Sequence, residues 1–186
     1  MSDLSNQHTA ATTTIEEAKS LSQAFLAVAG ALRGSGQPDA VFAVLERLYM
    51  QRVGFKMLTF MTTDREARIG RRVFTTSPET HPVGADKPVT ESDWVEMVLD
   101  RQEIFVANSV EDFRPHYVDW EFLREMGIGS AINYPIVVNR TTIGAVNLTA
   151  EPGYYTPERV AAGEPLSGLS AIAFLLLDHL ANRRQG

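Results

Sequence analysis

The chain has 186 residues and a formal net charge of -6; 44% of its residues are apolar, 22% are charged and none is cysteine. This composition fits one globular domain, and the missing cysteine excludes disulfides, thiolate metal sites, iron–sulfur clusters and thiol nucleophiles. The negative charge argues against a general affinity for nucleic acid, which depends on Lys and Arg contacts with phosphates.

The first 14 residues are rich in Thr, Ser and Ala, and we expect them to form a disordered tail, so that a single domain occupies residues 15–186. They lack the basic flank and apolar stretch of a signal peptide. The longest apolar run, residues 171–177, is much shorter than a membrane-spanning helix. We therefore expect a cytoplasmic protein that does not engage a membrane.

The first half of the domain predicts two helices, two strands and a long loop. Apolar residues recur at helical spacing over residues 15–33 and 39–52, and a glycine follows each run. Residues 55–62 and 68–76 are rich in aromatic, apolar and Thr residues and predict an antiparallel strand pair. Residues 77–88 contain Pro, Gly and Thr and predict an irregular loop of a length that often borders a binding site.

The second half predicts helices over about 92–101, 118–126 and 165–183, and strands over 103–107, 130–138 and 142–150. Asn139 lies in the short turn between the last two strands and suits it, because Asn tolerates a positive φ. The order predicts an α+β fold with a central antiparallel sheet. We expect the terminal helices to cover one face of this sheet, and short helices and the long loop to cover a pocket on the other.

The segment GSAINYPIVVNRTTIGAVNLTAE resembles the strand-turn-strand signature of GAF domains, with Ser130 at the start of a strand, Pro135 within it and Gly144 to Leu148 in the returning strand. The order of the other elements is similar over roughly residues 21–180. The resemblance implies a GAF/PAS-like sheet of strand order 2-1-5-4-3, a pocket away from the terminal helices, and a homodimer formed through those helices. It also implies sensing of small molecules such as cyclic nucleotides, bilins, haem or amino-acid-like metabolites. The chain lacks the cysteine that anchors a bilin or serves the methionine sulfoxide reductases of this family.

Strand alternation assigns the sheet residues to two faces. The residues predicted to face the terminal helices are Leu58, Phe60, Ile132, Ile136, Val146 and Leu148. Thr59, Asn133 and Asn147 are predicted to face the pocket, where hydroxyl and amide groups suit a polar ligand, and Trp94 is predicted to line it from the covering helix. Two alternatives are that Asn133 and Asn147 hydrogen-bond each other across the strands, and that Trp94 belongs to the core.

Charged candidates for the pocket come from the second strand and the loop. Of the adjacent Arg71 and Arg72, we prefer Arg72 because it shares strand parity with Phe74, and a guanidinium can hold a carboxylate or phosphate bidentately. His81 and Lys87 can close over an anion from the loop. The alternatives are a solvated edge-strand Arg and a solvated loop Lys.

Neither a metal site, a cofactor nor a catalytic residue is predicted. The four histidines lie far apart in the sequence, and no carboxylate cluster has metal-ligand spacing. His116 and Asp119 are spaced for a dyad, but neither a Ser nucleophile motif nor a Gly-rich phosphate loop accompanies them.

These features predict a sensor. A small polar or anionic ligand enters the pocket, changes how the terminal helices pack in a homodimer, and passes the signal to a separate output protein. One alternative is a small enzyme in which Arg72 orients an anionic substrate and a His, Asp or Tyr is the general acid or base, which requires a nearby titratable group such as His81 or His116 in the pocket. The other is a ligand-free dimerisation module whose cavity is filled by Met57, Met61 and aromatic side chains.

Overall fold

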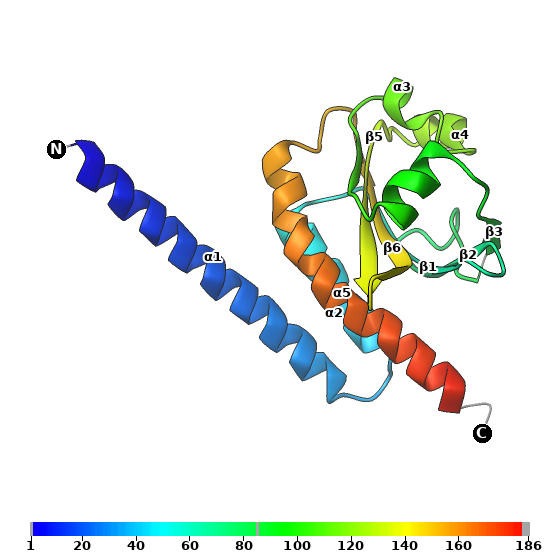
Figure 1. The fold of residues 1–186 in the computed structure, drawn as a ribbon, viewed down its shortest axis with the longest axis horizontal. Coiled ribbons are helices and arrows are strands. Elements are labelled where there is room, and N and C mark those ends of the chain that lie inside the picture. Colours follow the sequence, from blue (N-terminus) through cyan, green and yellow to red (C-terminus); the bar gives the residue numbers. More distant parts are fainter. Residues whose placement is uncertain (1, 85, 184–186) are drawn as a thin grey trace.

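The structure, a computed structural model, describes the backbone of residues 2–84 and 86–183 and the side chains of residues 15–84 and 86–183. The helices are α1 (Ser2–Leu32), α2 (Asp39–Arg52), η1 (Val95–Asp100), α3 (Val110–Phe113), α4 (Trp120–Glu125) and α5 (Pro157–Arg183). The strands are β1 (Met57–Asp64), β2 (Ile69–Thr75), β3 (Asp86–Pro88), β4 (Phe105–Ala107), β5 (Ser130–Val138) and β6 (Thr141–Ala150). Figure 1 shows α2 and α5 on one side of the sheet and η1, α3 and α4 on the other.

The six strands form one antiparallel sheet in the order β3-β2-β1-β6-β5-β4. β3 is a three-residue edge strand within the predicted loop. When β3 is left aside and the other five strands are numbered along the chain, the order reads 2-1-5-4-3, which confirms the predicted topology. The turn between β5 and β6 holds Asn139 and Arg140 at φ of 50° and 62°, the conformation that a tight hairpin requires.

The main hydrophobic core lies between the sheet and the long helices. α2 supplies Val41, Phe42, Leu45 and Tyr49, α5 supplies Leu166, Ala173 and Phe174, and α1 supplies Ala24 and Val28. All six sheet residues predicted to face the terminal helices belong to this core. The alternation of side chains along a strand therefore divided the two faces as expected.

A second, smaller core lies on the opposite face. Its sheet residues are Met57, Phe105, Ala107, Ala131 and Ala145, and its covering residues are Val95, Val98, Leu99, Phe113, Leu123 and Ile128. The segments that cover this face are short helices joined by loops. Polar side chains of the sheet therefore lie beside polar side chains of these loops, next to the apolar residues of the smaller core. The predicted binding residues lie here.

Both terminal helices begin earlier than predicted. α1 includes residues 2–14, where the sequence predicts a disordered tail, and the side chains of that segment lie outside the described residues. α5 begins at Pro157 and runs through Pro165, where the helix is predicted to start. The start follows the preference of proline for the first helical position, where its missing N–H removes no helical hydrogen bond.

Among the described residues, α5 is the helix that is long and apolar enough to cross a membrane, judged by length and composition alone. One side of α5 is packed in the domain, because Leu166, Ser170, Ala173 and Phe174 are buried against α2 and the sheet. A core helix of a soluble protein meets the same criterion. The buried side accounts for part of this apolar composition, whereas Leu175 on the other side is 50% exposed.

Candidate functional site

A row of polar side chains crosses three adjacent strands on the face away from the long helices. Thr59 of β1 lies opposite Asn147 of β6, and Asn147 lies opposite Asn133 of β5. Asn133 Nδ2 donates to Asn147 Oδ1 at 2.8 Å, and Asn147 Nδ2 donates to Thr59 Oγ1 at 3.3 Å. The strand register therefore builds a continuous amide and hydroxyl row, which we call the amide row.

Two aromatic residues from the covering segments bind to the end of the amide row. Trp94, which precedes η1, donates Nε1–H to Asn133 Oδ1 at 2.7 Å. The Tyr117 hydroxyl lies 3.2 Å from Asn133 Oδ1 and 2.9 Å from Asn133 Nδ2. Burial raises the pKa of Tyr117 to about 12, so its hydroxyl stays neutral. Tyr117 is not among the residues that the sequence predicts for the pocket, and this contact adds it to the site.

The amide row satisfies much of its own hydrogen-bonding capacity. The cross-strand bond between Asn133 and Asn147 is the alternative that the sequence left open. Asn133 also donates to the Ile132 carbonyl at 3.0 Å, so both polar atoms of its amide have protein partners. On the same face of β6, Thr149 Oγ1 is buried with no hydrogen-bond partner among the described residues. A ligand at the row would thus replace existing hydrogen bonds of Asn133 and Asn147, whereas Thr149 Oγ1 beside the row could accept a new one.

Arg72 reaches this face through a bulge in β2. Phe74 lies opposite Phe60 and Arg72 opposite Met61, so Val73 has no partner in β1. Phe74 packs edge-on against Phe60, with ring centroids 5.6 Å apart, on the helix side of the sheet. The extra residue turns Arg72 to the opposite face. The assumption that Arg72 and Phe74 share a face is therefore wrong, although Arg72 does lie on the side of the amide row.

The Arg72 guanidinium is buried and incompletely bonded. Its Nη1 donates to the Pro82 carbonyl at 3.1 Å, whereas Nε has no hydrogen-bond partner among the described residues. Burial lowers the pKa of Arg72, and the nearby Asp119 carboxylate opposes this effect. The neighbouring Arg71 is exposed and forms a bidentate pair with Asp86, at 2.6 and 2.9 Å. The two adjacent arginines thus differ: Arg72 is buried and incompletely hydrogen-bonded, whereas Arg71 is exposed and paired.

Asp119 lies close to the other two charged residues predicted for the pocket, His81 and Lys87. Its Oδ2 lies 3.5 Å from His81 Nε2 and 3.8 Å from Lys87 Nζ. Its Oδ1 is buried with no hydrogen-bond partner among the described residues. The dyad considered between His116 and Asp119 is not formed, because His116 packs edge-on against Phe105 with ring centroids 5.0 Å apart. The sequence spacing suggested only the nearby His116 as a partner and did not reveal His81.

The ring nitrogens of His81 contact protein groups, so His81 is better placed to hold the loop than to transfer a proton. Burial lowers the pKa of His81, the Arg72 charge lowers it further, and Asp119 opposes both effects. Its Nδ1 lies 2.9 Å from Thr80 Oγ1 while Nε2 faces Asp119, so both ring nitrogens have protein partners. A general acid or base needs a nitrogen within reach of substrate. In the part of the chain that the structure describes, no group of three or more Asp, Glu and His could hold a metal ion.

The predicted residues thus fall into two adjoining sets. The amide row with its aromatic partner holds Thr59, Trp94, Asn133 and Asn147, and the charged set holds Arg72, His81 and Lys87. The segment containing Tyr117 and Asp119 touches both sets.

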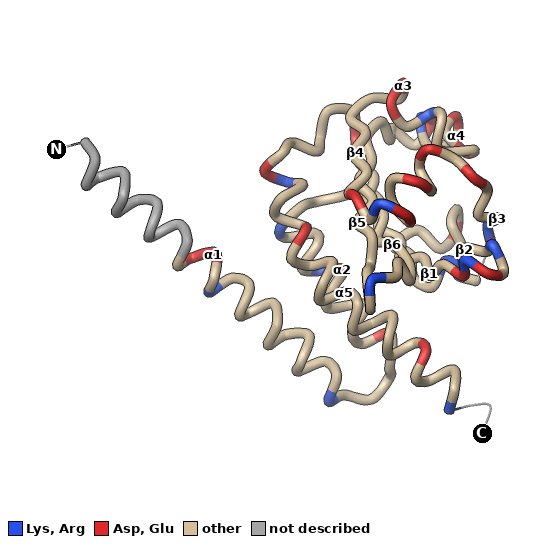
Figure 2. Tube along the Cα trace, viewed as in Figure 1, with Lys and Arg blue, Asp and Glu red and all other residues tan. Residues whose placement is uncertain are grey.

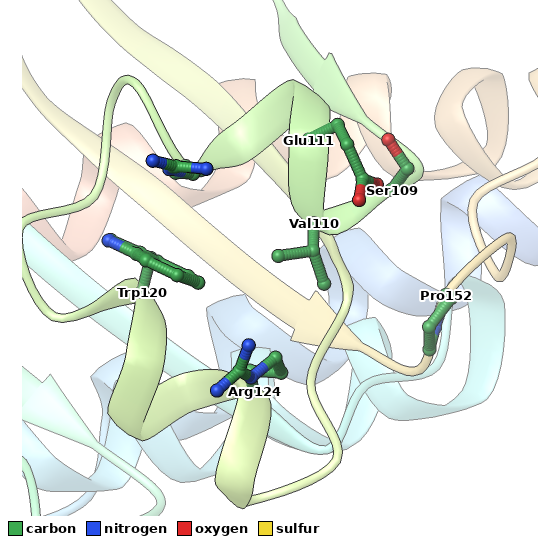
Figure 3. A pocket seen from close by; sticks show the side chains of 7 residues that line it. Ser109, Val110, Glu111, Trp120, Arg124 and Pro152 are labelled. Carbon is green, nitrogen blue, oxygen red and sulfur yellow. The ribbon is translucent and has the colours of Figure 1, made fainter.

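A separate hollow of about 300 Å³ lies beside this segment, between α3 and α4 (Figure 3). The guanidinium carbons of Arg114 and Arg124 lie 4.9 and 5.3 Å from the ring centroid of Trp120. Cation–π attraction holds guanidinium groups at such distances. The residues that line the hollow are Ser109, Val110, Glu111, Arg114, Trp120, Arg124 and Pro152.

Comparison with known proteins identifies one family and several solved structures of similar fold. The sequence pattern of the family described as GAF domain matches residues 38–174. The GAF domain of a two-component sensor histidine kinase from Bacillus halodurans is similar with a TM-score of 0.64 at 15% identity, covering 78% of this chain and 98% of that one. The GAF domain of a phosphoenolpyruvate-protein phosphotransferase from Coxiella burnetii has a TM-score of 0.65 at 15% identity, covering 92% and 98%.

The chromophore-binding domain of Stigmatella aurantiaca phytochrome P1 is also similar, with a TM-score of 0.60 at 13% identity, covering 82% of this chain and 59% of that one. At such identities the similarity concerns the fold alone. No match was found among curated protein sequences.

Proposed function

Because the chain belongs to the GAF domain family, we propose that it is a regulatory module that binds a small polar or anionic molecule between its sheet and the segment containing Tyr117 and Asp119. The similar GAF domains described above come from a sensor histidine kinase and a phosphotransferase, which supports a regulatory function. The proposed location is the cytoplasm, and the proposed output is a separate protein.

The observation that carries the proposal is the buried Arg72. A buried guanidinium destabilises a fold unless it is paired and hydrogen-bonded, yet Nε of Arg72 has no partner among the described residues. Arg72 lies opposite Met61 in β1, two residues from Thr59 of the amide row, which is about 7 Å along a strand. One small molecule can therefore place an anionic group at Arg72 and a neutral polar group at the row.

The test is a thermal-stability screen of carboxylates, phosphates, nucleotides and amino acids against the full chain. A ligand at about 100 times its dissociation constant adds roughly 2.7 kcal/mol to the free energy of unfolding. Arg72→Gln should abolish the shift given by an anionic hit. Arg71→Gln is the matched control, because it removes the same charge from the exposed neighbour.

Two results would count against the proposal. If none of these compounds stabilises the wild-type protein, the site is not a receptor for small molecules of these classes. The ligand-free module, which the internal bonding of Asn133 and Asn147 favours, would then be the better description. If a hit stabilises Arg72→Gln as much as wild type, the anion is held elsewhere.

We also propose that the terminal helices form a homodimer. The stretches 20–32 in α1 and 165–177 in α5 contain no charged residue. Figure 2 shows charged positions concentrated around β2, β3 and α4, with long uncharged lengths on both terminal helices. Phe25 and Leu26 of α1 are 55% and 66% exposed. A second copy would remove this apolar surface from water.

A further inference from the structure

Asp119 faces His81, Lys87 and the buried Arg72, but its carboxylate makes only long contacts with the first two. Its two contacts, 3.5 Å to His81 Nε2 and 3.8 Å to Lys87 Nζ, both involve Oδ2. Charge-assisted hydrogen bonds are shorter, at about 2.7–2.9 Å. Meanwhile an acceptor, Asp119 Oδ1, and a donor, Arg72 Nε, are both buried in this region without a hydrogen-bond partner among the described residues. The carboxylate occupies an anion site without completing it.

Asp119 also has a second position open to it. It is the N-cap residue of α4, and Asp is among the residues preferred there because its carboxylate accepts N–H groups of the first helical turn. In this structure its side chain makes no capping hydrogen bond. The carboxylate can therefore leave His81 and Lys87 and accept N–H groups at the start of its own helix, once the backbone at Asp119, now at φ of -97° and ψ of 22°, becomes extended.

The turn that carries Asp119 is weakly held. Val118 is 97% exposed, so the residue before Asp119 buries almost no apolar surface. Before it, Tyr117 bonds Asn133 and packs edge-on against Phe113, with ring centroids 5.5 Å apart. After it, Trp120 is partly buried against the smaller core. The turn thus depends on the contacts of two aromatic side chains, and segments with few inward contacts open at low free energy.

From these contacts we propose that Asp119 is a built-in occupant of the anion site formed by Arg72, His81 and Lys87, and that a small carboxylic acid with a neutral hydrogen-bonding group displaces it. The ligand carboxylate takes the place of the Asp119 carboxylate and bonds Arg72 Nε. Its neutral group reaches the amide row. Because the displaced group is itself a carboxylate, the site favours that class over phosphate. This inference rests on the proposed ligand-binding function.

Displacement of the Asp119 carboxylate should be detectable at the next residue, Trp120. Trp120 stacks with Arg114 and Arg124 and lines the hollow shown in Figure 3. When Asp119 turns from the cations to the cap of α4, the backbone at the start of this helix must adjust, and Trp120 moves relative to its two arginines. Occupation of the inner site thus changes the surface between α3 and α4.

The experiment uses the full chain labelled with fluorotryptophan, whose two tryptophans give two fluorine NMR signals that Trp120→Phe assigns. Sodium acetate is titrated against sodium chloride at equal ionic strength, and inorganic phosphate is the second probe. Asp119→Asn should bind acetate at least about tenfold more tightly than wild type, equivalent to about 1.4 kcal/mol, because the competing carboxylate is gone. Glu121→Gln is the matched control: it removes an exposed carboxylate two residues away and should bind as wild type does.

In the wild-type protein, acetate should change the chemical shift of the Trp120 signal. In Asp119→Asn this signal should differ from that of the wild type before acetate is added, and acetate should not change it further. Equal acetate affinity in wild type and Asp119→Asn overturns the inference, as does absence of acetate binding from both. Tighter binding of phosphate than of acetate by Asp119→Asn overturns the assignment to carboxylates. If Asp119→Asn does not fold, the wild-type Trp120 signal decides: a shift supports the inference and its absence overturns it. A metabolite that stabilises the wild type through Arg72 leaves the proposed function standing in each of these cases.

Discussion

At the scale of single residues, Asn133 connects the sheet with the segments that cover it. It lies on β5, and its amide bonds with Trp94, Tyr117 and Asn147, which come from three other parts of the chain. Since each partner would be left with a partly buried polar group, the loss of this amide should cost more than one ordinary hydrogen bond.

We therefore predict that Asn133→Ala lowers the free energy of unfolding by about 2–3 kcal/mol. Asn182→Ala, at the exposed end of α5 where the amide donates to Asp178, should change it by less than about 0.5 kcal/mol. Urea denaturation followed by circular dichroism measures both variants. Equal midpoints for Asn133→Ala and Asn182→Ala would show that the amide network contributes nothing to stability.

At the scale of elements, α5 illustrates how packing overrides local preference. Gly163 and Gly168 both lie inside this helix, where replacing Gly with Ala normally favours the helix. A Cβ at Gly163 would lie 2.3 Å from the Tyr134 hydroxyl oxygen and 2.8 Å from a Val53 methyl carbon. A Cβ at Gly168 would meet nothing within 4 Å. The first glycine permits close helix–sheet contact, and the second serves no such purpose.

The two substitutions should accordingly act in opposite directions. Gly168→Ala should raise the free energy of unfolding by about 0.4–1 kcal/mol through helix preference and unfolded-state entropy. Gly163→Ala should lower it by about 1–3 kcal/mol, because the extra methyl group overpacks a buried contact. Thermal unfolding of both proteins checks the signs. An increase for Gly163→Ala would mean that α5 does not approach β5 as closely as described.

At the scale of the whole molecule, the exposed apolar surface of α1 and α5 is the feature that the domain alone leaves unexplained. Leu26→Glu places a charge on this surface at a residue that is 66% exposed, so it should not harm the fold. We predict that it shifts the protein from dimer to monomer in sedimentation velocity, because burying an unpaired charge at an interface is unfavourable.

The control is Val118→Glu, which adds the same charge at another highly exposed apolar residue, 97% exposed and far from α1 in the sequence. Val118→Glu should sediment as wild type. If Leu26→Glu also sediments as wild type, then α1 does not form the interface.

Residue order along the chain was enough to predict the longer helices and strands and the face that most strand residues take, but it did not indicate β3 or α3. Alternation placed Leu58, Ile132 and Val146 in the helix-side core, and it placed Asn133 and Asn147 together across the strands. These features depend on side-chain order along one strand and on turn residues beside it, so a single sequence carries them.

The tertiary structure alone decided the charged part of the site. The bulge at Val73 depends on how β2 pairs with β1. Because of this bulge, Arg72 and Phe74 lie on opposite faces of the sheet, although strand alternation predicts the same face for both. The partner of Asp119 proved to be His81 from a distant loop and not the nearby His116. Pairing between strands and contact between loops arise from the packing of segments far apart in the chain, and no local pattern records them.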